Sequence, residues 1–424
     1  MRTKHNTKII LLILICFLVC ALWFANGFKK NYTLKDTEND IQNNPYAAKA
    51  YTRLGINLDE QGRKEEAIEK YKRAIEINPY LSEPYLSWAI VLLQQGKNEE
   101  AIQKLKMVIR LDPKEVMAYQ LSGLALYSLG KKEEAIEMYK QAITINPKYF
   151  DAYFQWGIIL FELGRKEDAI EKYKKVIQIN PKYINAYNNI ALVFVSLGER
   201  LDAIKIYKRI IEIEPNNIAA YNNWGIALYE LGKNEEAIEK YKKAIEINPK
   251  YVNGHYNYGK ALSKLNKKEE ALEKIKKVIE INPNESAAYN FSGITLFELG
   301  RIEEAIQKYQ KAIELNKNDA NLYGNLSQCY FIIRDRENGI KNLNIAFEKN
   351  ANNSVISLEL WFYKYAHLPV ERQNAKIRIE KLLALGVRST GWDLSRNVKV
   401  AIEDGHPEPK ILQKFADIIT RKKK

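Results

Sequence analysis

Apolar and polar residues along most of this chain follow a long, regular period. Prolines stand at positions 45, 79, 113, 147, 181, 215, 249 and 283, each 34 residues after the last. Ahead of Pro79, the apolar residues Ile68, Tyr71 and Ile75 lie three or four positions apart, which is the spacing of one helix face. Because proline cannot continue a helix, each proline closes one unit. The pattern predicts an array of identical supersecondary units.

Nine units of 34 residues, counted from Ala48, fill residues 48–353. Within a unit the fourth place is aromatic in all but one case, the eighth is small, and the twentieth is alanine in all but the last. Small residues at the eighth and twentieth places let two antiparallel helices approach closely. Glycine at the fifteenth place predicts a left-handed residue that ends the first helix, and Asn266 takes this place in the seventh unit.

These places carry a family resemblance. Tyr153-x-x-Trp156-Gly157-x-x-Leu160, followed by Ala169-x-x-x-Tyr173 and Pro181, resembles the tetratricopeptide-repeat signature. The ninth unit departs from it, with glycine, arginine and alanine at the twentieth, fifteenth and thirty-second places. The resemblance implies an all-α superhelical solenoid of helical hairpins, whose first helices line a concave face that binds proteins or peptides.

An uncharged, mostly apolar run precedes the repeats. Residues 1–8 form a basic flank, residues 9–28 carry no charge, and residues 29–47 read as a polar linker. Twenty residues span about 30 Å as a helix, which matches a bilayer's hydrocarbon core. No small-x-small cleavage site follows the run, so a transmembrane signal-anchor is favoured over export after signal cleavage. Three basic residues and the amino terminus before the run, compared with Lys29, Lys30 and Lys35 after it, favour the repeats on the non-cytoplasmic side.

Residues 354–424 lose the 34-residue register but keep helical patterning, which predicts a helical cap over the last repeat. Helices are expected over 355–367 and 370–385, from Asp393 to Gly405, and from Pro407 to the basic tail. A hydrolytic triad could be assembled from residues of this region, but no nucleophile elbow surrounds the serine. The residues available for it are Ser395, Asp393 and one of the two histidines His367 and His406. We therefore expect no enzymatic activity.

The net charge of +14 suggests a nucleic-acid partner at first sight. The excess of Lys and Arg is concentrated at the two ends, whereas Glu and Lys alternate within each repeat as on solvated helix faces. The period of 34 residues also differs from the 35 of RNA-reading pentatricopeptide repeats. No nucleic acid is expected, and the three cysteines and four scattered histidines indicate no disulfide, metal or cofactor.

Asparagines recur at inward-facing places of the first helices. The fifth place holds Asn188, Asn222 and Asn290, and the sixth holds Asn189, Asn223, Asn257 and Asn325. The sixth-place series is similar to the asparagine ladder in the repeat domain of O-linked N-acetylglucosamine transferase. An amide side chain can both donate to and accept from a peptide backbone, so we expect a solvated peptide-binding stripe here. Tryptophan at the seventh place of alternate repeats is assigned to packing between the helices; these residues are Trp88, Trp156 and Trp224.

The sequence therefore predicts a membrane-tethered scaffold for protein–protein interaction. Its expected partners are proteins or peptides in the concave groove, and the lipid bilayer through residues 9–28. No small-molecule substrate is expected. The alternative is a regulatory or substrate-recruiting subunit of an enzyme encoded elsewhere.

Overall fold

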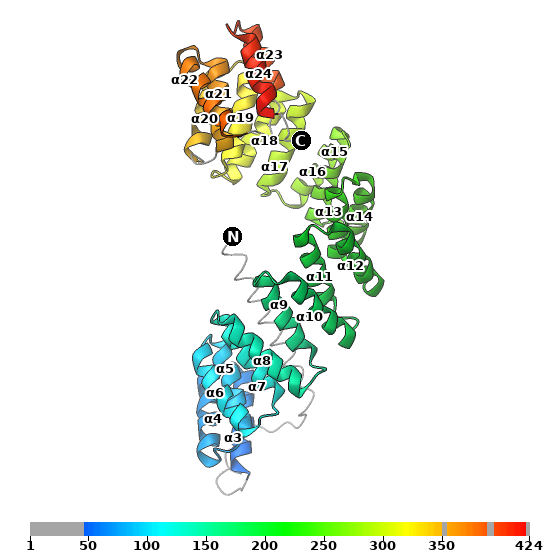
Figure 1. Ribbon diagram of the computed structural model, residues 1–424, viewed down its shortest axis with the longest axis vertical. Coiled ribbons are helices and arrows are strands. Elements are labelled where there is room, and N and C mark those ends of the chain that lie inside the picture. Colours follow the sequence, from blue (N-terminus) through cyan, green and yellow to red (C-terminus); the bar gives the residue numbers. More distant parts are fainter. Residues whose placement is uncertain (1–45, 350–353, 388–393, 421–424) are drawn as a thin grey trace. The chain divides into compact units, whose positions relative to one another are not determined.

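A computed structural model describes residues 46–349, 354–387 and 394–420, and within these ranges every regular element is helical (Figure 1). The predicted anchor at 9–28 lies outside them. None of the described helices combines the length and apolar character needed to cross a bilayer. The described chain divides into two compact units, one ending at Ala186 and the other beginning at Tyr187.

The first unit contains four helical hairpins, which correspond to repeats one to four. Its first helices are α3 (Ala47–Glu60), α5 (Ser82–Gln94), α7 (Val116–Ser128) and α9 (Phe150–Glu162). Its second helices are α4 (Lys64–Ile77), α6 (Asn98–Leu111), α8 (Lys132–Ile145) and α10 (Lys166–Ile179). Each second helix ends before the Asx-Pro dipeptide of its repeat, as the sequence predicts.

The second unit contains the remaining repeats and the cap, with α11 (Ile184–Leu197) starting just before the division. Its other first helices are α13 (Ile218–Glu230), α15 (Val252–Lys264), α17 (Ser286–Leu299) and α19 (Ala320–Ile332). Its second helices are α12 (Arg200–Ile213), α14 (Asn234–Ile247), α16 (Lys268–Ile281), α18 (Ile302–Leu315) and α20 (Arg336–Lys349).

Close approach within each hairpin explains the small residues of the pattern. In repeat four Ala169 is fully buried, and Tyr173 of the second helix is 1% exposed. The Tyr173 ring lies so near the backbone of Gly157 that a Cβ atom there would come within 2.6 Å of it. The eighth place is therefore small because the tyrosine of the facing helix occupies the space.

The turns between paired helices adopt the predicted left-handed conformation. Gly164 has a φ of +77° at this place, and Asn266 has a φ of 60°. Arg334 also has a positive φ, 65°, although it carries a side chain. Gly339 stands at the twentieth place, where the other repeats have alanine. It is glycine because a Cβ atom there would come within 2.8 Å of the Phe331 ring.

The cap consists of α21 (Ser354–His367), the 3-10 helix η1 (Pro369–Glu371), α22 (Arg372–Ala384), α23 (Ser395–Glu403) and α24 (Pro409–Thr420). The four α-helices match the four predicted ones, although the expected cap residue Asp393 lies outside the described ranges. Helices α21 and α22 form a hairpin that follows α20, and α24 packs against α21, α22 and α23. A shared apolar core joins these helices to Phe331 and Leu343 of repeat nine.

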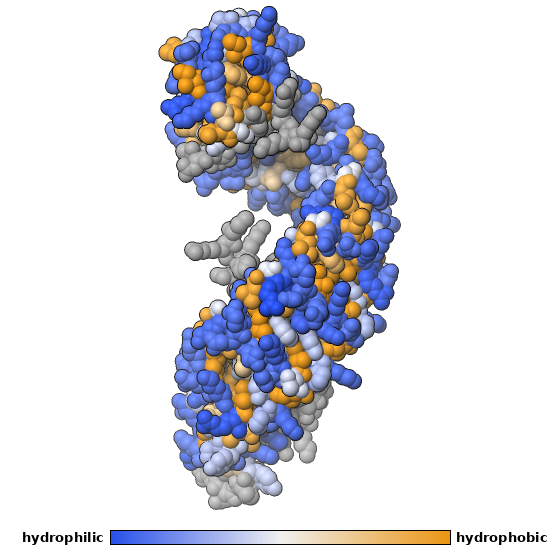
Figure 2. All heavy atoms as spheres, in the orientation of Figure 1, coloured by the Kyte–Doolittle hydropathy of each residue, from blue (hydrophilic) through white to orange (hydrophobic). Residues whose placement is uncertain are grey.

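Hydrophilic residues cover much of the visible surface, interrupted by apolar patches (Figure 2). Oppositely charged residues three positions apart pair along the second helices, as in Lys311 with Glu314 at 2.7 Å and Lys277 with Glu280 at 2.6 Å. This confirms that the alternating charges within the repeats lie on solvated helix faces.

Candidate partner-binding surface

We call the residues at the fifth, sixth, ninth and twelfth places of the first helices the first-helix face. Its asparagines form hydrogen bonds between neighbouring repeats. Asn257 on α15 donates from Nδ2 to Oδ1 of Asn222 on α13 at 3.0 Å. Asn222 in turn donates to Oδ1 of its neighbour Asn223 at 3.3 Å. Three predicted site residues are thus brought together at one junction.

The same arrangement recurs two repeats later. Asn325 on α19 donates from Nδ2 to Oδ1 of Asn290 on α17 at 3.1 Å. In both places the sixth-place amide of one repeat binds the fifth-place amide of the repeat before it. Asn188 and Asn189 are half-buried on α11 and belong to neither hydrogen-bonded group.

The exposure of these asparagines differs from the expectation of a uniformly solvated stripe. Asn223 is exposed, but Asn222 is only 5% exposed, and Asn257 and Asn325 are half-buried. Helix α13, which carries Asn222, packs against α12 of the preceding repeat and α15 of the following one. An asparagine amide has two donor hydrogens and an acceptor oxygen, so one bond between repeats leaves hydrogen-bonding capacity for a partner.

Apolar residues at the ninth place form a second feature of the face, one that the asparagine pattern in the sequence does not reveal. Leu192 on α11 is 44% exposed and Ile294 on α17 is 37% exposed. Ile226, at the same place of α13, is half-buried. The signal was present in the sequence, because the ninth place is apolar in most repeats although it faces outward from the hairpin.

Lys260 interrupts this apolar series at the ninth place of repeat seven. Its ammonium lies 5.3 Å from the ring centre of Tyr229, the twelfth-place residue of the preceding repeat. A cation held over a tyrosine face is attracted by the ring's electron density. Burial raises the pKa of Tyr229, so the phenol stays neutral beside the lysine. The second unit therefore presents amide, apolar and cationic groups on one face.

The tryptophans at the seventh place lie half-buried between lysines of two successive second helices. Lys104 and Lys72 lie 3.9 and 5.9 Å from the ring centre of Trp88. Around Trp156 the corresponding lysines lie at 4.4 and 5.8 Å, and around Trp224 at 4.1 and 5.5 Å. Trp88 also packs against the apolar core of repeats one and two. These contacts agree with a packing role.

The histidines of the hypothetical triad make structural contacts. His367 stacks on Phe331 with ring centres 4.5 Å apart, and burial lowers its pKa to about 4. Nε2 of His406 lies 3.1 Å from the Tyr365 carbonyl oxygen, and its Nδ1 accepts from the Glu408 amide. Asp393 lies outside the described residues. Stacking and turn formation therefore account for both histidines.

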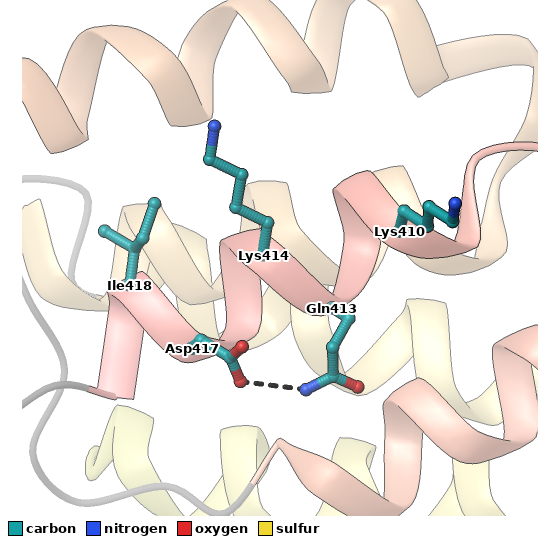
Figure 3. A pocket seen from close by; sticks show the side chains of 5 residues that line it. All are labelled: Lys410, Gln413, Lys414, Asp417 and Ile418. Atoms are coloured by element: carbon teal, nitrogen blue, oxygen red, sulfur yellow. Dashed lines mark hydrogen bonds between the residues drawn. The ribbon is translucent and has the colours of Figure 1, made fainter.

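Among the described residues, the remaining thiol and the potential metal ligands form no catalytic or metal site. Burial raises the pKa of the Cys329 thiol to about 12, which disfavours the nucleophilic thiolate. Within the described ranges no cluster of three or more His, Cys, Asp or Glu side chains has the arrangement of a metal site. A shallow pocket lies along α24, and all five side chains that line it come from that one helix (Figure 3). Gln413 donates to Asp417 there at 2.8 Å.

Family models match most of the repeats individually. The model described as "TPR repeat" matches residues 89–130, 123–164, 157–198, 225–266 and 293–331. Models described as "Tetratricopeptide repeat" match residues 48–81, 184–217, 206–239 and 252–285. Together these matches extend over more than half of the chain. No curated protein matches the sequence significantly.

Several solved structures are similar over part of the chain. A crystal structure of MamA is 32% identical, with 38% of this chain and 94% of that chain covered and a TM-score of 0.37. YrrB, described as "a TPR protein with an unusual peptide-binding site", is 22% identical, with coverages of 44% and 96% and a TM-score of 0.38. PilF of Pseudomonas aeruginosa is 22% identical, with coverages of 51% and 96% and a TM-score of 0.43.

Proposed function

As a member of the tetratricopeptide-repeat family, this chain has the fold of a protein-binding array, and we propose that it binds a protein or peptide along its first-helix face without catalysing a reaction. Members of the family generally mediate protein–protein interaction. The observation that carries the proposal is the amide, apolar and cationic surface of repeats five to nine. Leu192 and Ile294 expose apolar side chains on the same first-helix face as the two asparagine pairs.

This surface suits an extended peptide or an exposed helix. Amides bind backbone groups whatever the peptide's sequence, and the exposed ninth-place residues offer contacts for apolar side chains. Lys260, held over Tyr229, would favour an acidic side chain at the matching position of the partner. We accordingly keep Asn188, Asn189, Asn222, Asn223, Asn257, Asn290 and Asn325 as the predicted contact residues.

Site-specific cross-linking tests the proposed surface. A photoreactive amino acid replaces Leu192 or Ile294 in the full chain, and a control chain carries it in place of exposed Lys276 on α16. We expect a discrete cross-linked partner from both first-helix positions and none from the control. Equal cross-linking from position 276 would place binding on the second helices instead. Recovery of one stoichiometric enzyme would favour the alternative role as a recruiting subunit.

We further propose that residues 9–28 tether the chain to a membrane, with the repeats on the non-cytoplasmic side. The support is the uncharged run of bilayer length with basic residues on both sides. Carbonate washing should leave the full chain in the membrane pellet, whereas a chain that begins at residue 31 should be released. A mature N-terminus beyond Ala25 on a soluble protein would instead establish export after cleavage.

A further inference from the structure

Helix α23 covers the first-helix face at repeat nine. It packs against α19, the first helix of that repeat. Gln328, at the ninth place of α19, is only 4% exposed, whereas Leu192 and Ile294 at the same place of other repeats are 44% and 37% exposed. A segment of the chain itself thus occupies part of the surface that the proposed function assigns to a partner.

Arg396, near the start of α23, reaches repeat eight. Its guanidinium donates through Nη1 to the Phe297 carbonyl oxygen and through Nη2 to that of Glu298 at 3.1 Å. The same group lies 5.4 Å from the Phe297 ring centre. The C-terminal end of a helix carries partial negative charge on its last carbonyls, so the end of α17 can bind a cation above an aromatic ring.

The other end of α23 is acidic and meets two arginines. Arg334 pairs with Glu403 at 3.2 Å and with Asp404 at 3.0 Å, and Arg336 pairs with Asp404 at 2.8 Å. Between the two charged ends, Val398 and Ala401 are buried in the apolar core that the cap shares with Phe331 of repeat nine, and Leu394, just before the helix, is buried there too. Helix α23, which has a cationic start, an apolar middle and an acidic end, therefore lies against the C-terminal ends of α17 and α19 and against the core of the cap.

The fit of α23 is incomplete. Asn397 of α23 is fully buried, yet neither its Oδ1 nor its Nδ2 has a hydrogen-bond partner. Nε2 of the buried Gln328 also has none. Buried polar groups without partners cost free energy that a better-matched occupant would recover. The ion pairs at the acidic end are partly exposed and weaken with salt. Both features make α23 a replaceable occupant.

We propose that the first-helix face of repeats eight and nine is a binding site for a partner helix of this same chemistry, and that α23 occupies it until the partner displaces it. The partner carries an arginine at the start of the helix, apolar residues three or four positions apart, and acidic residues at its end. The inference rests on the proposed use of the first-helix face for binding, and it adds the class of partner and a means of regulation.

A peptide with the sequence of residues 394–406, labelled with fluorescein, tests this without knowledge of the natural partner. In the full chain, Val398→Asp should release α23, because Val398 is 2% exposed. We expect this variant to bind the peptide at least tenfold more tightly than the unaltered chain does. Lys399→Asp is the matched control, since its side chain is 78% exposed on the same helix, and it should bind like the unaltered chain.

Two further variants keep the test decisive. Arg396→Ala removes the contacts to α17 without placing a charge in the core, and it should also tighten peptide binding, by several-fold. A peptide carrying Val398→Asp should not bind. Equal peptide affinity of all chains, with circular dichroism showing intact helices, would overturn the inference. That result would leave cross-linking from positions 192 and 294 unaffected, so failure of the general binding function would be recognised separately.

Discussion

The hydrogen bond between Asn257 and Asn222 allows the structural and binding roles of the asparagines to be separated. Asn222 is 5% exposed, and its Oδ1 accepts from Asn257 at 3.0 Å. Asn257→Ala leaves this buried acceptor without that donor, which costs about 1–3 kcal/mol in comparable cases. Because Asn257 is only half-buried, water can replace part of the bond, and we expect about 1–2 kcal/mol of local destabilisation.

Native-state hydrogen exchange is the suitable assay, because each repeat of such an array contacts mainly its neighbours and a global transition averages over them. Amides of α13 and α15 should exchange roughly 5–30 times faster in Asn257→Ala, and amides of α7 should be unchanged. Asn223→Ala is the matched control, because Asn223 is exposed and its bond is longer, 3.3 Å. It should change stability by less than about 0.5 kcal/mol.

Measurements of partner affinity then separate the binding role of the asparagines from their structural role. If the amides bind a peptide, Asn223→Ala should lower affinity by about 1 kcal/mol while leaving exchange unchanged. Unchanged exchange in Asn257→Ala would refute the structural part of the reasoning. Unchanged affinity in Asn223→Ala would remove that amide from the binding surface.

Three further predictions concern stability. Trp156→Leu should destabilise repeat four by about 1–2 kcal/mol, measured by local hydrogen exchange, because two lysine–indole contacts and ring packing are lost; Lys140→Ala should cost less, and an equal effect would contradict this. The folded-state pKa of His367 is about 4 against an ordinary 6.5, so cap stability should be complete above pH 6.5 and decline toward pH 4. His367→Phe should remove this pH dependence of α21 exchange, and its persistence would exclude the histidine as the cause. Arg334→Gly removes the strain of a positive φ at a residue with a side chain, but it also removes the ion pair with Asp404. Because salt already weakens that pair in the unaltered chain, the melting temperature of the variant relative to the unaltered chain should be higher in high salt than in low salt. A salt-independent difference in melting temperature would contradict the ion-pair argument.

Much of the fold could be predicted because the interactions that form each hairpin act within one 34-residue repeat and recur in the next. The small residue at Gly157, the buried Tyr173 and the left-handed turn at Asn266 each act within one hairpin, so sequence spacing alone reveals them. The four cap helices could also be placed, since prolines and glycines mark their ends. Their packing could not, because no period relates α23 to the first helix against which it folds back.

The candidate site was predictable only in part. Aligning repeats by place groups Asn189, Asn223 and Asn257 as equivalent residues, yet the hydrogen bonds join residues 35 apart, from one fifth place to the next sixth place. This offset depends on how successive hairpins are rotated, which the composition of a single repeat does not specify. Arg334 likewise departs from the glycine expected at the fifteenth place. The structure shows that it pairs with Glu403 and Asp404 at the end of α23, which the sequence pattern does not reveal.

The junctions within the second unit alternate between two chemistries. Arg200 pairs with Glu230 between repeats five and six, and Lys268 pairs with Glu298 between repeats seven and eight. The asparagine pairs occupy the junctions between repeats six and seven and between repeats eight and nine. Each kind of contact is therefore found at every second junction, and the two amide pairs lie 68 residues apart. A partner that uses both asparagine pairs must extend from repeat six to repeat nine, and α23 packs against the first helix of repeat nine. Under the proposal above, a partner that uses only the first pair leaves α23 in place, whereas a partner that also occupies repeats eight and nine competes with the chain's own helix.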